Sequence, residues 1–600
     1  MTLSAPPGSS DEPRNSTGAT VGRSVWYLPL AVGLVTFAAF APALRNGFVD
    51  WDDGYLYISN PHWRGLGWSQ IRWMFTTPLL ENYVPIAWLT LGFDYILWGL
   101  RPVGYHLTNL LLHSGSAALL YVIATRLLAR AAGLTGWPLQ AGAVASALFF
   151  SLHPLRVESV AWISERRDVL SGILFLATIL LYLDSTEASG SRQRRLLLAS
   201  LGTYVLAIGS KVLVVTLPLT LILLDIYPLR RLPLDPRRWF ERSHRPLWLE
   251  KLSYFVLGAT GAAIAYTILH RDGAVQILPF GDALGKFAFA LWFHFRTTVV
   301  PIGLSPLYEL PPRMDPLAAP FLVAGIGVIA VTVAAILLVR TWPAVLIVWA
   351  HHIIVLAPVS GIAHAGFQLT ADRFSYLAGP GWALLVGAGA GVLVRTAQGR
   401  GREAIVARGG AVIVALWLFV LGYLSWQQTQ IWRTTETLWH AAISEAPDCA
   451  KCHATFGSWL MGHGQEMAGL EHLYQASILR PDRPMAYGLL GQAYAQVGRL
   501  PEAVAAYRQE LALRPHMTEA QMGLGTVLIR IGRPAEAIPY LEAVIRLNPR
   551  AGVPHMALAE AYLALGDLDR ARAQHEMLRE LDPVEAARLG NRIAAATQSR

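Results

Sequence analysis

The most marked shortage in this 600-residue sequence is of charge. Only 15% of the residues are charged and 54% are apolar, whereas ordinary soluble domains carry about 25% charge. This composition excludes a wholly soluble protein and predicts a membrane protein with a soluble part attached. The net charge of +9 does not indicate nucleic-acid binding, because the basic residues cluster between apolar runs, as at 230–245 and 395–410. Such clusters are typical of cytoplasmic loops.

We also expect no cleavable signal peptide. The first 23 residues are polar and rich in small residues, so we expect 1–23 to form a disordered cytoplasmic N-terminus. The apolar run at 25–44 exceeds the core of a signal peptide, which is about 7–15 residues. No small-residue cleavage site follows the run, so we expect it to remain as the first membrane span.

Apolar runs close to the ~20 residues that a transmembrane helix needs predict about eleven spans within a domain at 24–430. The runs lie at 25–44, 104–130, 138–152, 168–184, 195–210, 211–227, 250–270, 319–340, 343–360, 374–395 and 407–427. With a cytoplasmic N-terminus, the arginine-rich loops 185–195, 228–249 and 395–408 all fall inside, as the positive-inside rule requires. Two further apolar stretches are not counted as spans: 83–100 is expected to lie along the membrane surface, and 287–295 to be a surface-lying or re-entrant helix.

This topology predicts a multi-pass protein of a bacterial plasma membrane. The basic isoelectric point and the frequent arginine, alanine and glycine suggest the bacterial setting. The loops 45–103, 153–167, 271–318 and 361–373 fall on the extracytoplasmic side, as does everything after 428.

A regular period begins after residue 428. Prolines recur every 34 residues at 447, 481, 515, 549 and 583, and glycines at 464, 498, 532 and 566 keep the same step. This is the period of the tetratricopeptide repeat, which folds as a pair of helices. The sequence thus predicts a repeat domain at 431–600, with units at 448–481, 482–515, 516–549 and 550–583 and a final cap. Stacked units form a concave groove suited to extended peptides.

The stretch FVDWDDGYLYISN (48–60) places Asp50, Asp52 and Asp53 among aromatic residues at the predicted outer face. One interpretation is a hydrated acidic loop without chemistry. The other is that the aromatic side chains desolvate a carboxylate and raise its pKa, so that it can take a proton from an attacking hydroxyl.

Further ionisable residues are predicted on the same face, in HPLRVESVAWISERRD (153–168), in the short turn with Lys211, and in QLTADRFSYL (368–377). Arginine could hold a departing phosphate through two parallel hydrogen bonds and lysine as a point charge. Alternatively, the arginines of 153–168 pair only with Glu158 and Glu165, and Lys211 merely extends toward the membrane surface. We interpret His351 and His352 as packing residues and not as metal ligands.

Several of these motifs together resemble one family. They are FVDWDD, GYHLTNLLLHSGSAALLYVIATRLL (104–128), HPLRVESVAWISERRDVLSGILFL (153–176), SKVLVVTLPLTLILLD (210–225) and ADRFSYLAGPG (371–381). In this order they resemble GT-C-fold membrane glycosyltransferases, specifically the transmembrane-and-tetratricopeptide-repeat O-mannosyltransferases and their bacterial relatives, over about 25–583. The resemblance implies an all-α fold, in which a GT-C-type membrane domain precedes a repeat α-solenoid.

The resemblance also implies site residues. The acidic pair of the first outer loop corresponds to Asp52 and Asp53 as catalytic residues, which leaves Asp50 outside the pair. The donor-phosphate and substrate-binding set corresponds to His153, Glu158, Arg166, Asp168, Arg373 and Tyr376, and we add Lys211. One departure is Val212, where relatives often carry glutamate.

The implied reaction moves a hexose such as mannose from a polyprenyl-phosphate donor to serine or threonine hydroxyls of exported proteins, with inversion. Asp52 or Asp53 would act as general base, cationic side chains would stabilise the leaving phosphate, and the repeat groove would hold the acceptor protein or peptide. The aspartate pair could instead bind Mg²⁺ or Mn²⁺, so a divalent cation stays an open alternative and no metal ligand is assigned. The rival functions are a glycosyltransferase for envelope glycan or lipid, and a membrane-anchored repeat scaffold without activity.

The only two cysteines lie in CAKCH (449–453). Their spacing matches the c-type haem attachment pattern. The 34-residue alignment, however, puts Cys452 and His453 at ordinary sites of a first repeat helix, where haem would disrupt the packing. We therefore expect no haem at Cys449, Cys452 and His453. The alternatives are a local disulfide, packing residues, or a zinc site with His463.

Overall fold

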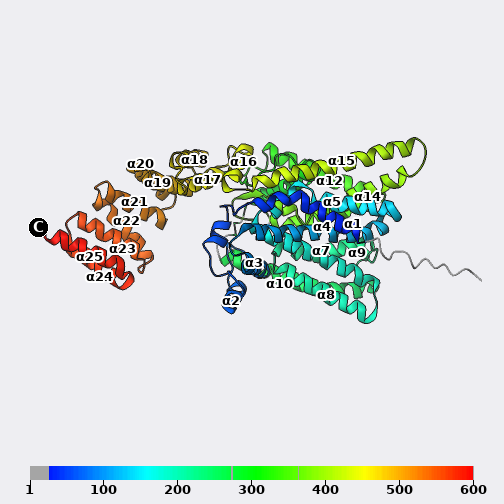
Figure 1. Cartoon of the computed structure of the whole chain (residues 1–600), viewed down its shortest axis with the longest axis horizontal. Coiled ribbons are helices and arrows are strands. Elements are labelled where there is room, and N and C mark those ends of the chain that lie inside the picture. The colour runs from blue at the N-terminus through cyan, green and yellow to red at the C-terminus, as the bar shows by residue number, and fades with distance from the viewer. Residues whose placement is uncertain (1–25, 272–274, 277, 362–363, 599–600) are drawn as a thin grey trace, which may run out of the picture.

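The structure is a computed structural model that describes residues 26–271, 275–276, 278–361 and 364–598. The predicted N-terminal tail at 1–23 lies outside these residues. Within them the fold is all-α, apart from two short antiparallel strand pairs. Figure 1 shows a helical bundle followed by an arched row of repeat helices, with the C-terminus at the far end of that row. This agrees with the predicted fold class.

Each of the eleven predicted spans contains a helix. These helices are α1 (Tyr27–Phe40), α4 (Pro102–Ala132), α5 (Gly136–Ser151), α7 (Arg166–Glu187), α8 (Gly190–Ile208), α9 (Leu217–Ile226), α10 (Arg245–Arg271), α12 (Ala319–Leu337), α13 (Pro343–Leu356), α14 (Gly379–Ala397) and α15 (Arg402–Ile431). Among the described residues, seven helices are long and apolar enough to cross a membrane, and the helical segments Val212–Ile226 and Pro343–Val359 are shorter and apolar. The chain is therefore a multi-pass membrane protein, and the number of eleven crossings stays a prediction.

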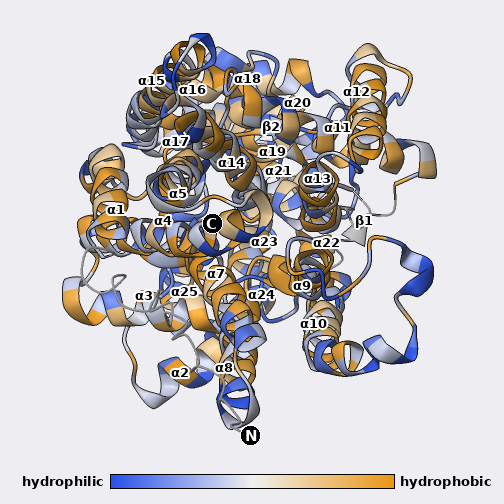
Figure 2. Cartoon of the chain, turned by 90° about the vertical axis from the view of Figure 1, so that its right-hand side faces the viewer, coloured by the Kyte–Doolittle hydropathy of each residue, from blue (hydrophilic) through white to orange (hydrophobic). Residues whose placement is uncertain are grey.

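Apolar side chains lie on the outside of the bundle as well as in its interior. Ile326 and Leu337 on α12 and Phe419 on α15 are each about two-thirds or more exposed, and Figure 2 shows hydrophobic residues on peripheral helices such as α1 and α12. Inside, α5 and α14 approach closely because small residues line the contact. A Cβ on Gly387 would collide with the carbonyl oxygen of Gly142. Such small-residue contacts are typical of membrane helices.

The segments between the spans carry further elements, most of them short. They include η2 (Gly54–Ile58), α2 (Trp68–Thr76), α3 (Pro85–Trp98), η3 (Pro154–Arg156), α6 (Val157–Ala161), η4 (Ile163–Glu165), η5 (Val212–Thr216), α11 (Phe280–Val299) and η9 (Asp372–Ser375). Strand β1 (Val275–Gln276) pairs with β3 (His364–Ala365), and β2 (Tyr308–Glu309) pairs with β4 (Gln368–Thr370). Helices α3 and α11 occupy the two apolar stretches that were not counted as spans.

The repeat domain begins with α16 (Thr435–Glu445). Paired helices then fall within the four predicted units, and α25 forms the cap: α17 (Ala450–Gly462), α18 (Glu466–Leu479), α19 (Pro484–Gln496), α20 (Leu500–Leu513), α21 (Thr518–Arg530), α22 (Pro534–Leu547), α23 (Gly552–Ala564), α24 (Leu568–Leu581) and α25 (Pro583–Gln598). The periodic glycines sit in the turns between paired helices, where φ is between 75° and 80°. Glycine adopts this left-handed conformation without a steric penalty.

The two cysteines lie at the start of α17 and are joined in a disulfide. The two sulfurs are bonded to each other, whereas haem attachment needs free thiols and zinc binding needs thiolates. The ring of His453 is also engaged, because it contacts the carbonyl oxygen of Pro447 at 3.2 Å and the ring of His472 at 2.9 Å. The local disulfide is therefore the alternative that the structure contains.

Candidate active site

A cavity of about 310 Å³ opens where several connecting loops meet at one end of the bundle. Its wall combines apolar and aromatic residues with four residues that carry the candidate chemistry, namely Asp52, Arg166, Arg167 and Arg373. The turn at 79–82, the start of α3 and the segment 366–368 complete the wall. The family resemblance assigned site residues to these same loops, and the structure brings those loops together around one cavity.

Two acids, Asp52 and Glu81, line this cavity, and Asp52 is the one that belongs to the acidic pair of the first loop. It is partly buried, and within the described residues its carboxylate has no hydrogen bond and no ion pair. Burial raises the pKa of Asp52 above its ordinary value of 3.8, and the nearby positive charges of Arg167 and Arg373 oppose the rise. A partly desolvated carboxylate without a protein partner is suited to accept a proton from a bound hydroxyl.

Asp53 has a different environment, although it is the next residue. Its side chain is fully buried and accepts hydrogen bonds from the indole N–H of Trp162 at 3.1 Å, the Ser164 hydroxyl at 2.5 Å and the backbone N–H of Val49 at 3.0 Å. Burial raises the pKa of Asp53 to about 7 against these hydrogen bonds. Asp53 thus fixes the loop that carries Asp52, and it is absent from the cavity wall.

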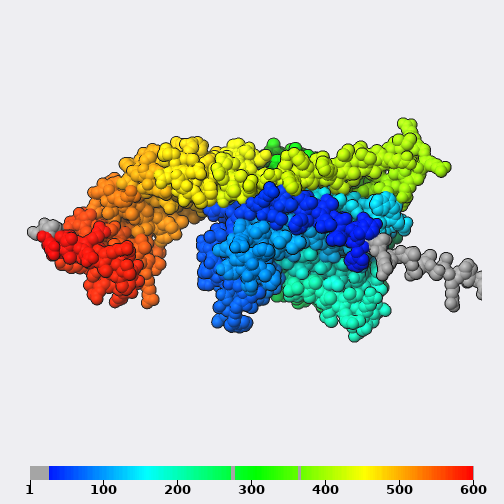
Figure 3. All heavy atoms as spheres, viewed as in Figure 1, coloured from blue at the N-terminus to red at the C-terminus, as the bar shows by residue number. Residues whose placement is uncertain are grey.

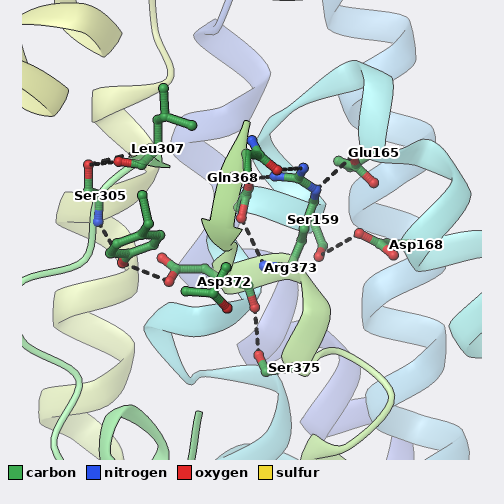
Figure 4. A network of polar contacts seen from close by, with 12 residues as sticks. Ser159, Glu165, Asp168, Ser305, Leu307, Gln368, Asp372, Arg373 and Ser375 are labelled. Carbon is green, nitrogen blue, oxygen red and sulfur yellow. Dashed lines mark hydrogen bonds and ion pairs between the residues drawn. The ribbon is translucent and has the colours of Figure 1, made fainter. Parts of the chain in front are cut away.

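Glu165 is the centre of the charge network beside the cavity. Its fully buried carboxylate pairs with Arg167 at 2.7 Å, Lys211 at 3.2 Å and Arg373 at 3.2 Å. Figure 4 shows Arg373 between Gln368 and Glu165, and Gln368 accepts a hydrogen bond from Arg373 at 2.8 Å. One acid therefore orients three cations that arise from separate segments of the chain.

The other predicted acids occupy supporting positions in the same network. Glu158 accepts hydrogen bonds from the backbone N–H and guanidinium of Arg373, and Asp168 pairs with Lys211 and accepts a hydrogen bond from Ser159 at 3.1 Å. Neither acid reaches the cavity wall. Both hold the cations that flank the cavity.

Arg166 lines the cavity but is committed to its own partners. Its fully buried guanidinium pairs with Asp94 at 2.7 Å, donates to the Tyr105 carbonyl at 2.9 Å and bonds the side-chain oxygen of Asn109. Arg167 and Arg373 are slightly exposed in comparison, with 17% and 10% of their side-chain surface accessible. They are the cations better placed to meet a ligand.

Two predicted site residues lie away from the cavity. The His153 ring caps η3 by accepting from the backbone N–H of Leu155, and its other nitrogen contacts the carbonyl oxygen of Thr298 at 3.1 Å. The Tyr376 hydroxyl bonds the ring of His113 at 2.8 Å, deep in the bundle. Both side chains therefore shape the scaffold. Val212 begins η5, next to Lys211.

Sequence reasoning passed over Glu165 and Arg167 as site residues. Both stand in SERRD, so the clue was the alternation of charge in that run. Only the short turn η4 shows that the Glu165 carboxylate points inward and that Arg167 reaches the cavity. The aromatic residues of the wall, such as Trp162 and Trp88, gave no signal in the sequence beyond their size.

The loop of Asp52 also contacts the repeat domain. The Trp51 ring stacks on Trp162 at 5.0 Å and lies 5.2 Å from Trp439 of α16. On the other side of this junction, Glu309 accepts from the backbone N–H of Lys451 at 3.0 Å and pairs with Arg480 at 3.5 Å. The repeats are thus bonded directly to the loops that form the cavity.

Comparisons with known proteins agree with both parts of this architecture. Two family models described as tetratricopeptide repeat match residues 460–518 and 528–593. The protein O-mannosyl-transferase TMTC1 of Homo sapiens is 23% identical over 503 residues, which cover 75% of this chain and 55% of that protein. The chain resembles the TMTC O-mannosyl-transferases.

The resemblance is partial in length. The protein O-mannosyl-transferase Tmtc3 of Drosophila melanogaster is 37% identical over 126 residues, which cover 19% of this chain and 14% of that protein. The chain thus spans about half or less of these two relatives. A solved structure of MamA aligns over 25% of this chain and 88% of the MamA chain, at 22% identity and with a TM-score of 0.24. This TM-score is low, so the likeness supports no conclusion about the present chain.

Proposed function

We propose that this protein is an integral-membrane glycosyltransferase of the GT-C type. It moves a hexose such as mannose from a polyprenyl-phosphate donor to serine or threonine hydroxyls of exported proteins, at the extracytoplasmic face of a bacterial plasma membrane. The observation that carries this proposal is the placement of Asp52. Within the part of the chain that the structure describes, its carboxylate has no protein partner, and it faces a cavity that is also lined by Arg167 and Arg373. The names of the curated relatives support the reaction class.

The proposed reaction is one displacement at C1 of the sugar. The acceptor hydroxyl gives its proton to the Asp52 carboxylate, and the acceptor oxygen forms a bond to C1. The bond between C1 and the phosphate oxygen breaks, and the lipid phosphate leaves with the bonding electron pair. Attack opposite to the leaving group inverts the anomeric centre. Protonated Asp52 then releases its proton to water.

The arginines of the cavity stabilise the charge that develops on the phosphate. Arg167 and Arg373 bring positive charge to the cavity wall, which can stabilise a phosphate electrostatically, and Glu165 holds both in place. Lys211 is engaged by Glu165 and Asp168, so it acts by positioning Glu165. The guanidinium groups supply the positive charge that the departing phosphate needs, and the proposed reaction has no step through a metal.

The acceptor is proposed to reach the cavity from the repeat side. Figure 3 shows an open hollow between the distal repeats and the outer loops of the bundle. An extended acceptor segment held by the repeats would lie next to the junction at Glu309 and Trp439, which adjoins the cavity. This arrangement favours a protein acceptor over a small glycan.

Mass spectrometry of secreted and envelope proteins tests the proposal. Cells that lack the gene should lose a defined hexose on serine or threonine, and the wild-type gene should restore it. Loss of sugar from an envelope glycan or lipid instead would move the acceptor to that class. No change in any glycan would contradict the proposal and favour a scaffold.

The pH dependence of the reaction follows from the environment of Asp52. The base must be ionised, so we expect kcat/KM to fall as the pH falls through the pKa of Asp52, at a pH above 3.8 because burial raises that pKa. The charged groups that act on Asp52 are Arg167, Arg373 and Lys451, which lower its pKa, and Glu165, which raises it. A pH–rate profile in proteoliposomes measures this acidic limb.

The variant Arg373→Gln provides a control for this pH–rate profile. Removing this cation takes away one influence that lowers the pKa of Asp52, so the acidic limb should move to higher pH. A limb that stays in place, or moves to lower pH, would show that Asp52 is not the base that titrates.

A further inference from the structure

The segment 229–245, here called the basic loop, joins α9 to α10 at the end of the bundle away from the cavity. Helix α7 runs from one end of the bundle to the other. Its first residues, Arg166 and Arg167, line the cavity, and Tyr182 near its other end hydrogen-bonds Asp225 at 2.7 Å, just before the loop. Tyr182 lies 16 positions after Arg166 on this helix, which corresponds to a rise of about 24 Å at 1.5 Å per residue. Figure 2 looks onto this end of the bundle.

The basic loop is folded and not an open connection. Leu232 is buried, and two indole N–H groups hold the chain together. The Trp239 indole donates to the carbonyl oxygen of Pro233 and the Trp248 indole donates to that of Trp239, both at 2.8 Å. Two short turns, η6 (Pro236–Arg238) and η7 (Arg242–His244), complete the loop. Its side chains are therefore presented on a defined surface.

One arginine of the basic loop anchors it to the bundle. Arg231 pairs with Asp225 at 3.1 Å and with Glu250 at 2.9 Å, and Lys251 pairs with Asp225 at 2.8 Å. Together with the Tyr182 hydroxyl this forms a closed polar network at the base of the loop. Arg231 thus serves the fold and is not available to a ligand.

The remaining arginines face outward. Arg230, Arg237, Arg242 and Arg245 are exposed, and within the described residues none of their guanidinium groups makes an ion pair or a hydrogen bond. Arg238 is exposed too but pairs with Glu241 at 2.8 Å. The outward surface of the basic loop thus carries five exposed arginines against two exposed acids, Asp235 and Glu241, and the guanidinium groups of four of these arginines have no partner among the described residues.

Exposed apolar side chains lie among these arginines. Phe240 is 79% exposed and stacks on Trp248 at 5.2 Å, and Leu234 is 52% exposed. The exposed side of α10 continues with Leu249 and Leu252, which face outward where the helix enters the bundle. Aromatic and basic residues combined beside an apolar helix are typical of a membrane–water interface.

We propose that the basic loop is a binding site for anionic lipid headgroups in the leaflet opposite to the cavity. The arginines bind lipid phosphate oxygens, and Phe240 and Leu234 enter the headgroup layer. A lipid fits better than a soluble anion, because the loop is held between two membrane helices and an exposed phenylalanine contributes nothing to binding a free ion. Basic residues next to a membrane attract anionic lipids strongly enough for several of them to act together.

The test uses the full chain, purified in mild detergent and titrated with phosphatidylglycerol or phosphatidylcholine, with bound lipids counted by native mass spectrometry. The triple variant Arg237→Gln, Arg242→Gln and Arg245→Gln should lose phosphatidylglycerol binding by about tenfold or more. The matched control removes the same charge from exposed arginines of the repeat domain, Arg514→Gln, Arg546→Gln and Arg550→Gln, and should bind like the wild type.

A second measurement places the loop relative to the bilayer. The native cysteines are joined in a disulfide, so Phe240→Cys provides a single thiol for an environment-sensitive dye. Its emission should shift to the blue in vesicles that contain phosphatidylglycerol and shift less in pure phosphatidylcholine. Equal phosphatidylglycerol binding by the wild type and the triple variant would overturn the proposal, as would emission typical of water in both vesicles. Full competition by millimolar inorganic phosphate would assign the site to a soluble anion and also overturn it.

Discussion

Replacing Asp52 with asparagine should lower the rate of sugar transfer by about 10²–10⁴-fold, the usual contribution of a general base. The carboxylate has no protein partner among the described residues, so its loss removes the proton acceptor without breaking a contact of the fold. Transfer from a polyprenyl-phosphate hexose to an acceptor peptide, measured in proteoliposomes, reads the rate. Thermal unfolding of the same preparation should be close to that of the wild type.

Asp50→Asn is the matched control for this experiment. Asp50 lies two residues away and is exposed, and it contacts the repeat domain through its backbone N–H, which donates to Thr435 at 2.9 Å. Its substitution should leave the rate nearly unchanged. If Asp52→Asn retained full transfer activity, the assignment of Asp52 as the base would have to be abandoned. Asp53→Asn should lower both stability and rate, because Asp53 holds the loop.

Replacing Glu165 with glutamine should destabilise the protein by about 3–5 kcal/mol, the usual effect of removing one partner from a buried ion pair. The substitution leaves Arg167, Lys211 and Arg373 without the carboxylate that they share. The loss should appear as a lower unfolding temperature in detergent. Transfer activity should fall as well, since Arg167 and Arg373 lose their orientation.

The control for Glu165 is the same substitution at Glu502, which pairs with Arg499 on the surface of the repeat domain at 2.8 Å. Surface ion pairs contribute little to stability because solvent screens them, so Glu502→Gln should scarcely move the unfolding temperature. An unfolding temperature of Glu165→Gln equal to that of Glu502→Gln would contradict the central role of Glu165 in the network.

The periodic and apolar parts of the fold could be predicted from the sequence. The helix pairs lie in the units that the proline and glycine steps predicted, because glycine at a left-handed turn and proline near a helix start are local requirements. Apolar runs likewise coincide with helices, since a lipid environment leaves the backbone few alternatives. The strand pair of β2 with β4 was not foreseen, because it joins segments about 60 residues apart.

The structure brings the predicted segments together, but it gives the predicted residues different surroundings. Asp52 and Asp53 could not be told apart, because the difference depends on Trp162 and Ser164 from a distant loop. His153 and Tyr376 were expected to bind substrate, yet their polar atoms are engaged by Thr298 and His113. Sequence patterns place a polar side chain near a site but do not say which way it points.

Trp51 connects the bundle and the repeat domain through the packing of its side chain. Trp51 immediately precedes Asp52, and its ring packs between Trp162 of the bundle, Trp432 at the end of α15 and Trp439 of α16. A truncation before α16 would expose this ring and remove the packing that holds the segment with Asp52, the proposed base, in place. Inactivity of such a truncated protein would then report a misaligned carboxylate, even with a substrate that needs no repeats. Helix α16 of the repeat domain thus covers one side of the loop that carries Asp52.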